Sequence, residues 1–366
     1  MSNKFPKVFF IIIFVSLTLL LTRDIDIENI DTNQYNSKIV KEVLLWKCKE
    51  LASNSYYKED YENAIKALKK ALSVDNTDIE LYYNLGNIYS KIDQPLLAIE
   101  NFEKALKLNQ NDYTLYLNLG NSYYEISDYK SSLKYYLKAY NLKPDDPGVI
   151  NNVGVGYQLN SDFLKAIEYY NKAIEIDPKY EIAYSNLGEL YYTQQNYTKS
   201  IEYYKKALEI NSNAVNYTNL GYAYFLSNNL KGAEENYKKA IEVNSSYATA
   251  YSKLALVKIQ QKHYESALAN IKKALALDPE LALTYNYLGV LYYSKREYKK
   301  AIRQFKKGIS LDPRSDDTYN NLGMVYFDLR QYKNAKSYFE RAIEINPNLE
   351  IAKNNLQKTL KRLKRY

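Results

Sequence analysis

A small residue recurs every 34 residues along this chain, with one step of 33. The recurring residues are Ala52, Gly86, Gly120, Gly154, Gly188, Gly221, Ala255, Gly289 and Gly323. Two more small residues follow in each copy, as Ala64 and Ala71 do in the first. A fixed period of this length is typical of solenoids, in which each unit packs only on its neighbours. The nine copies therefore predict one continuous stack of repeats.

Each copy has the periodicity of two α-helices. In the eighth copy, one face of the first helix carries Tyr285, Leu288, Gly289 and Tyr292. The second helix repeats the spacing with Ala301, Phe305 and Gly308, and Pro313 ends it. Gly or Ala at a helix crossing lets two backbones approach closely while a large neighbour fills the flank. We therefore expect the small residues to mark the helix crossings.

The high tyrosine content also arises from the repeat. Tyrosine occurs 42 times, against 10 Phe and 1 Trp. One position of the copy holds Tyr82, Tyr116, Tyr184, Tyr217, Tyr251, Tyr285 and Tyr319, and another holds Tyr89, Tyr123, Tyr157, Tyr191, Tyr224, Tyr292 and Tyr326. We expect their rings to pack beside the small residues and their hydroxyls to reach partners or water.

The composition argues against several kinds of function. The chain has one cysteine, Cys48, and one histidine, His263, so an internal disulfide, a two-histidine metal site and a zinc finger are excluded. The formal net charge of +8 is mild beside the dense basic faces of nucleic-acid binders. Polar residues recur at the repeat spacing instead of converging. We expect no enzyme activity, cofactor, metal or nucleic-acid partner.

The repeated residues resemble the tetratricopeptide repeat family, whose pattern of large residue, Leu-Gly, Tyr, Ala, aromatic, Ala and Pro matches from about Leu45 to Leu349. The resemblance implies an all-α fold, a right-handed α-solenoid of helix-turn-helix repeats within residues 38–349. The nine expected units are 45–78, 79–112, 113–146, 147–180, 181–213, 214–247, 248–281, 282–315 and 316–349. Residues 350–366 keep helical spacing but have a basic outer face, which predicts a capping helix.

The amino terminus carries a separate signal. Val8 to Leu21 is an apolar run broken only by Ser16 and Thr18, which predicts one hydrophobic N-terminal helix. Residues 1–23 are expected to be an uncleaved membrane anchor, with residues 5–22 in the membrane, or a cleaved signal peptide that would leave the chain secreted. Residues 24–37 are expected to be a polar linker. The basic charges before the run place the repeats outside the cytoplasm, in a periplasm, lumen or extracellular space.

The family resemblance also implies a superhelix whose inner wall is formed by the first helices. Helix geometry places unit positions 2, 5, 6, 9, 12 and 13 on that wall. The wall is polar in the amino-terminal units and apolar in the later units. The polar candidates for partner binding are Asn84, Asn87, Asn118, Asn121, Asn152, Asn186 and Asn219. The apolar and aromatic candidates are Tyr222, Phe225, Leu256, Ile259, Val290, Tyr293, Met324 and Phe327. We expect these apolar side chains to have no packing role within the chain and so to mark a binding site.

The asparagines at one position of the unit resemble the asparagine ladder of O-linked N-acetylglucosamine transferase, which holds peptide backbone, although Asn is also common there across the family. Lys253 and Tyr287 interrupt the series. No three consecutive units supply the Lys, Asn and Arg set with which some family members clamp chaperone carboxy termini.

These observations predict a membrane-tethered scaffold or adaptor that binds a peptide segment of another protein in the groove. Two alternatives stay open. The first is an organelle-surface import or chaperone co-receptor with cytosolic repeats, against which the flanking charges argue. The second is a self-assembling structural oligomer, in which another copy fills the groove.

Overall fold

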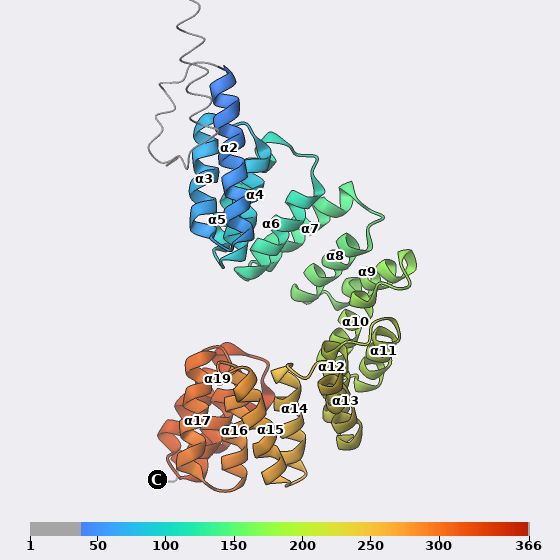
Figure 1. The fold of residues 1–366 in the computed structure, drawn as a ribbon. Coiled ribbons are helices and arrows are strands. Elements are labelled where there is room, and N and C mark those ends of the chain that lie inside the picture. The colour runs from blue at the N-terminus through green and yellow to red at the C-terminus, as the bar shows by residue number, and fades with distance from the viewer. Residues whose placement is uncertain (1–37, 365–366) are drawn as a thin grey trace, which may run out of the picture. The chain divides into compact units, whose positions relative to one another are not determined.

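The computed structural model describes residues 38–364, and it is all helical within this range. The predicted fold class is confirmed, since the helices form consecutive antiparallel pairs followed by a final single helix (Figure 1). The first helices of the pairs are α2 (Lys38–Tyr57), α4 (Ile79–Lys91), α6 (Tyr113–Glu125), α8 (Pro147–Leu159), α10 (Glu181–Thr193), α12 (Ala214–Leu226), α14 (Ala248–Gln260), α16 (Ala282–Ser294) and α18 (Asp316–Asp328). The predicted N-terminal helix and linker lie outside the described residues.

The second helices complete the pairs. They are α3 (Tyr61–Val74), α5 (Pro95–Leu108), α7 (Tyr129–Leu142), α9 (Phe163–Ile176), α11 (Tyr197–Ile210), α13 (Leu230–Val243), α15 (Tyr264–Leu277), α17 (Tyr298–Leu311) and α19 (Tyr332–Ile345). The final helix is α20 (Glu350–Leu363), which packs mainly on α19. The first pair differs from the others because α2 begins at Lys38, ahead of the repeat register that starts at Leu45.

Short polar side chains start many of these helices. Asp78 Oδ1 accepts a hydrogen bond from the backbone N–H of Glu80 at 3.0 Å at the start of α4. Asp60 does the same for Asn63 N at 3.2 Å at the start of α3. Such caps satisfy N–H groups that have no partner within the helix. Where the sequence supplies such a side chain, it helps to fix the first residue of the helix.

The small residues lie where two helices cross. Gly86 in α4 lies directly beneath the Phe102 ring of α5, and a Cβ atom added to Gly86 would stand 2.4 Å from Phe102 Cε1. Ala64, Ala98 and Ala173 on the second helices are completely buried. The side-chain volume allowed at each crossing is therefore set by the neighbouring helix, as the repeat pattern predicts.

The recurrent tyrosines pack across the two helices of one repeat. Tyr123 stacks on Tyr135 with ring centroids 5.3 Å apart and an interplanar angle of 11°. Tyr191 stacks in the same way on Tyr203, at 5.4 Å and 14°. Offset stacking of this kind adds to the free energy gained from burial. The tyrosines therefore help to hold each helix pair together.

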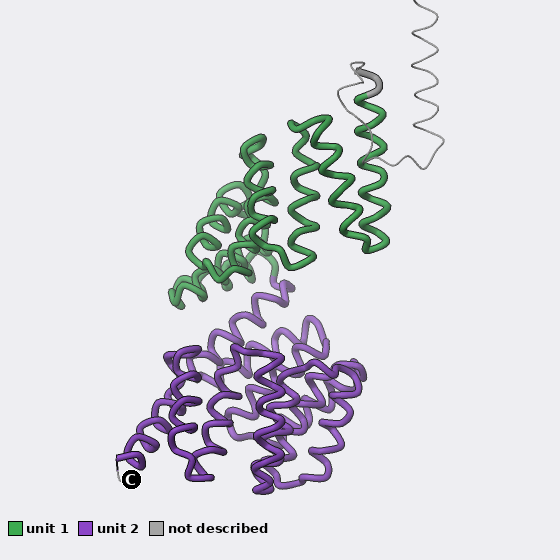
Figure 2. The backbone as a smooth tube through the Cα atoms, turned by 90° about the vertical axis from the view of Figure 1, so that its left-hand side faces the viewer, with its two compact units in different colours: residues 1–177 green, residues 178–366 purple. Residues whose placement is uncertain are grey.

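The chain divides into two compact units, one up to Asp177 and the other from Pro178 (Figure 2). In unit 2, consecutive first helices pack directly on each other, as α12 does on α14 and α14 on α16. The contacts between consecutive second helices are weaker. Because first helices lie closer together than second helices, unit 2 curves toward the first-helix side. Among the described residues, no helix combines the length and the apolar character needed to cross a bilayer.

Candidate protein-binding surface

The polar part of the predicted wall lies in unit 1. Asn84 and Asn87 project from α4 into a cavity of about 330 Å³. The other residues that line it are Lys49, Ala52, Ser53, Tyr56, Tyr57, Leu68, Glu80 and Ile88. Lys49 is not available as a free cation there, because its Nζ lies 2.8 Å from Asp78 and 2.6 Å from Glu80. The cavity therefore offers amide and tyrosine side chains with little net charge.

The remaining candidate asparagines of unit 1 differ in whether their side-chain amides are hydrogen-bonded within the chain. Asn118 Nδ2 donates to Asn87 Oδ1 at 3.3 Å, which links α6 to α4. Asn121 Oδ1 accepts a hydrogen bond from Tyr136 Oη at 2.8 Å. Asn152 is half-buried on α8 and does not line this cavity. The structure therefore brings Asn84, Asn87 and Asn118 together.

The apolar part of the predicted wall lies in unit 2 and is more covered than expected. Leu256, Met324 and Phe327 are half-buried and lie on α14 and α18. Ile182 and Val215 are more open, with 47% and 49% of their surface exposed. An apolar surface remains, but it consists mostly of partly covered side chains.

Three residues do have a packing role within the chain, contrary to our expectation. Ile259 is only 6% exposed and belongs to a core cluster with Ala255 and Leu288. Phe225 packs against the buried residues of α13 and α14. Val290 packs against the buried clusters of two neighbouring repeats. The prediction was wrong for these residues because close contact between the first helices turns part of the wall into core.

Tyr293 also has internal partners. Its ring packs against the core formed by α17 and α18, and its hydroxyl donates to Asp328 at 2.7 Å. Burial and the nearby Asp328 carboxylate raise the pKa of Tyr293 above its usual value. Tyr293 is therefore held in place by its own unit.

The asparagine series in unit 2 is broken in its centre. Asn186 and Asn219 are half-buried on α10 and α12. At the same position, α14 carries Lys253 and α16 carries Tyr287, which is 7% exposed. Asn321 donates to Asn286 Oδ1 at 3.0 Å. A continuous ladder of asparagine amides is therefore absent from the described part of unit 2.

Lys253, one of the two interrupting residues, lies in an aromatic cluster that the sequence did not reveal. Lys253 Nζ lies 3.5 Å from the centre of the Tyr222 ring, a favourable position for a cation over an aromatic face. The Tyr222 ring lies 5.5 Å from Tyr192 and 6.4 Å from Phe225, measured between centroids. Lys253 makes no hydrogen bond or ion pair with any residue in the range 38–364. Sequence reasoning missed this cluster because its members come from different repeats.

The environment of the cluster shifts several pKa values. Burial lowers the pKa of Lys253 to about 8, and the charge of Asp317 opposes this change. Burial, and then the neighbouring Asp316 carboxylate, raise the pKa of Asp317. Burial also raises the pKa of Tyr222 and Tyr287, so both remain protonated near neutral pH. The first-helix wall of unit 2 thus combines aromatic and apolar surface with an ammonium group whose donors are unsatisfied.

The side chains gathered on this wall are of kinds suited to binding another protein. Within residues 38–364, no three His, Cys, Asp or Glu side chains are grouped as a metal site requires. Burial raises the pKa of the Cys48 thiol to about 11, which disfavours the nucleophilic thiolate. The groups that the described wall residues can offer a partner include apolar side chains, tyrosine hydroxyls, amides and the Lys253 ammonium.

Sequence models of the tetratricopeptide repeat match nearly all of the described helices. The matched segments are 79–112 and 317–349, 145–213 and 179–246, 54–93 and 291–330, and 113–146 and 248–281. No curated protein sequence matches the chain.

Several solved structures share the fold. A tetratricopeptide repeat protein from Parabacteroides merdae is 20% identical, with a TM-score of 0.56, and the match covers 68% of this chain and 98% of that protein. The Cut9–Hcn1 hetero-tetramer of the APC/C matches at 16% identity and a TM-score of 0.54, over 90% of this chain and 78% of that one. Yeast Tom70 matches at 16% identity and a TM-score of 0.50, over 88% of this chain and 89% of its own. At these identities the similarity shows the fold alone.

Proposed function

The chain belongs to the tetratricopeptide repeat family, and we propose that it is a protein–protein interaction scaffold that binds a segment of a partner along the first-helix wall of unit 2. The observation that supports this site is Lys253. An ammonium group with little exposure and no hydrogen-bond acceptor is costly, unless a partner supplies the acceptor. On the same wall, Leu256, Met324 and Phe327 supply partly exposed apolar surface.

The chemistry of the wall suits an extended or helical peptide. Apolar side chains of the partner would cover Leu256 and Met324, while amides of Asn186 and Asn219 would bond its backbone. The cavity of unit 1 around Asn84 and Asn87 is a second place where backbone amides would be held. In this proposal the chain positions its partner and catalyses no reaction.

We further propose that the scaffold is tethered to a membrane through residues 5–22, with the repeats on the extracytoplasmic side. The apolar run from Val8 to Leu21 and its flanking charges support this arrangement. Added protease should then cut the repeats in intact spheroplasts or sealed vesicles of the right orientation. Protection of the repeats under those conditions would instead favour cytosolic repeats.

The binding site is tested by removing two half-buried apolar side chains of the wall. We expect Leu256→Ala combined with Met324→Ala to weaken the captured complex at least tenfold, since about 1.4 kcal/mol is tenfold in affinity. The measurement is crosslinking of the full chain in native membranes, followed by quantitative identification of each captured protein. Phe225 is a poorer choice because it packs into the core of its own unit.

The matched control is Ile210→Ala combined with Val243→Ala. These side chains lie at the ends of α11 and α13 and are 37% and 51% exposed. The control should leave capture unchanged. Equal capture by both double variants would reject the first-helix wall as the binding site.

A further inference from the structure

The turn between the two helices of each repeat contains one residue with a positive φ angle, and none of these residues is glycine. They are Glu59, Asp93, Ser127, Ser161, Gln195, Asn228, Lys262, Arg296 and Arg330. In unit 2 the last three are basic, with φ angles of 63°, 60° and 59°. The left-handed region disfavours side chains other than those of Asn and Asp, and Gly is the easiest residue there. The conformation of the turn therefore does not explain why Lys and Arg occupy it.

The three basic turns belong to consecutive repeats and lie at the same edge of unit 2. Lys299 and Lys333 follow within the first turn of α17 and of α19 and add to this edge. All five cations are exposed. None of the five takes part in an ion pair with a residue in the range 38–364. Lys295 and Lys300 differ from them, because both pair with Glu297.

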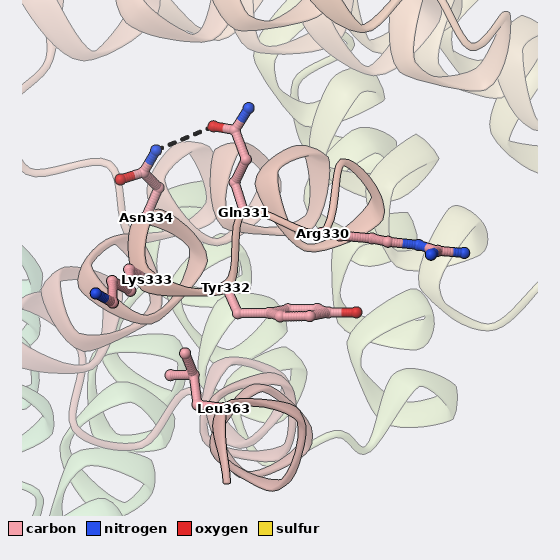
Figure 3. Close-up of a pocket in the computed structure, with 6 residues that line it drawn as sticks. All are labelled: Arg330, Gln331, Tyr332, Lys333, Asn334 and Leu363. Atoms are coloured by element: carbon pink, nitrogen blue, oxygen red, sulfur yellow. Dashed lines mark hydrogen bonds between the residues drawn. The ribbon is translucent and has the colours of Figure 1, made fainter. Parts of the chain in front are cut away.

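The edge continues onto the end of the final helix. Arg330, Gln331, Tyr332, Lys333, Asn334 and Leu363 line a cavity of about 470 Å³ between the turn after α18 and the end of α20 (Figure 3). In this view the Tyr332 ring lies above Leu363, while the Arg330 and Lys333 side chains extend in opposite directions. Lys361, Arg362 and Lys364 flank Leu363 and are exposed. The C-terminal end of unit 2 is thus densely basic.

Apolar side chains accompany these charges. Leu329 precedes Arg330 and is 36% exposed, and Leu360 on α20 is 38% exposed. At a lipid interface, apolar side chains can enter the boundary between headgroups and acyl chains while neighbouring lysines and arginines attract anionic headgroups. A row of separate, flexible cations also suits a surface with many negative charges, because such attraction requires no fixed pairing geometry.

We propose that this basic turn edge, formed by Lys262, Arg296, Lys299, Arg330 and Lys333 with the end of α20, binds the anionic headgroups of a lipid bilayer. The contact would hold unit 2 against the membrane and would leave the first-helix wall to a protein partner. It does not depend on the proposed groove, so failure of either proposal leaves the other standing.

The test uses the full chain reconstituted into vesicles, with a donor fluorophore on Gln331→Cys and an acceptor on a trace lipid headgroup. The buried Cys48, with its raised pKa, should resist labelling, and the unsubstituted chain checks this. The vesicles contain either phosphatidylcholine alone or phosphatidylcholine with 30% phosphatidylglycerol. We expect energy transfer to be at least twofold higher in the anionic vesicles and to fall to the neutral level in 0.5 M NaCl, since salt screens exposed charges.

The decisive variant replaces the three turn cations with Lys262→Asn, Arg296→Asn and Arg330→Asn. Asn adopts the left-handed conformation more readily than Lys or Arg, so the variant should fold and melt like the parent. It should lose most of the extra energy transfer in anionic vesicles. The matched control, Lys272→Gln with Lys273→Gln and Lys306→Gln, removes three exposed charges from α15 and α17 and should retain it.

Three outcomes would overturn the proposal. They are equal energy transfer in neutral and anionic vesicles, no change in the Asn variant, and an equal loss in the control. Tight binding of a poly-glutamate peptide without any lipid effect would assign the edge to an acidic protein segment and would also reject the bilayer.

Discussion

Small residues recur at several positions of the repeat, and their surroundings differ from one position to another. Gly86 lies beneath the Phe102 ring, where an added Cβ would be 2.4 Å from the nearest ring atom. Gly308 is also a small repeat residue, but an added Cβ there would be 3.4 Å from the nearest atom, Ala282 O. The two glycines therefore serve different purposes, and they occupy different positions of the repeat, Gly86 on a first helix and Gly308 on a second helix.

This difference gives a prediction at the residue scale. Gly86→Ala should destabilise the protein by about 2 kcal/mol, because the Phe102 ring must shift in a packed core. Gly308→Ala should be neutral or stabilise by up to about 1 kcal/mol, because Ala favours the helix and the site has room. Urea unfolding of both variants checks this. Equal losses of stability would show that the crossing at Gly86 is looser than described.

A second prediction concerns Ala173, which is completely buried in α9. Ala173→Arg should cost about 3 kcal/mol or more, since it forces a long charged side chain into a close helix crossing. Lys172 is a poor control because its Nζ contacts the Tyr140 hydroxyl and ring. Glu175→Arg, on the exposed side of the same helix, is better matched and should change the melting temperature by less than half as much.

The Lys253 ammonium gives a prediction about pH. Because burial lowers its pKa to about 8 in the folded chain, the unfolded chain binds more protons between that value and the ordinary lysine value. The cost of the buried charge is complete below pH 8 and disappears as the pH rises through this window. The tyrosines that face Lys253 have raised pKa values, so they do not titrate in the lower part of the window.

Lys253→Met isolates this effect. At pH 7 we expect the variant to be more stable than the parent by about 1–2 kcal/mol, a discounted value because Lys253 is partly exposed. The difference should shrink steadily in denaturant titrations between pH 7 and pH 9.5. A difference that stays constant over this range would show that Lys253 titrates normally.

At the scale of helices, the contacts between first helices decide which wall residues remain available. Position 12 of the unit places Phe225, Ile259 and Phe327 on the same face of successive first helices. In the structure, Ile259 is buried in a core cluster, and Phe225 is partly buried against another. Phe327 packs edge-on against the Tyr332 ring, with the two ring centroids 5.4 Å apart. Periodicity identifies the face, but the distance to the next first helix determines whether a side chain on it is covered.

At the scale of the molecule, stability should be local, because each repeat contacts its neighbours and the two units have separate sets of contacts. Ala301→Arg changes a completely buried residue of α17. Hydrogen exchange should then accelerate strongly in α16, α17 and α18, while amides of α4 and α8 keep their rates within about twofold. Equal acceleration in α4 would show that the whole chain unfolds as one cooperative block.

The sequence by itself determined the repeat, the pairing of helices, the small residues at the crossings and the C-terminal cap, because each depends on contacts within a repeat or with the next one. Periodicity and helix geometry are sufficient for such contacts. The burial of Ile259 and the position of the Lys253 ammonium over the Tyr222 ring were decided only by the tertiary structure. These features depend on how closely successive repeats approach, and that spacing is set jointly by side chains from several repeats.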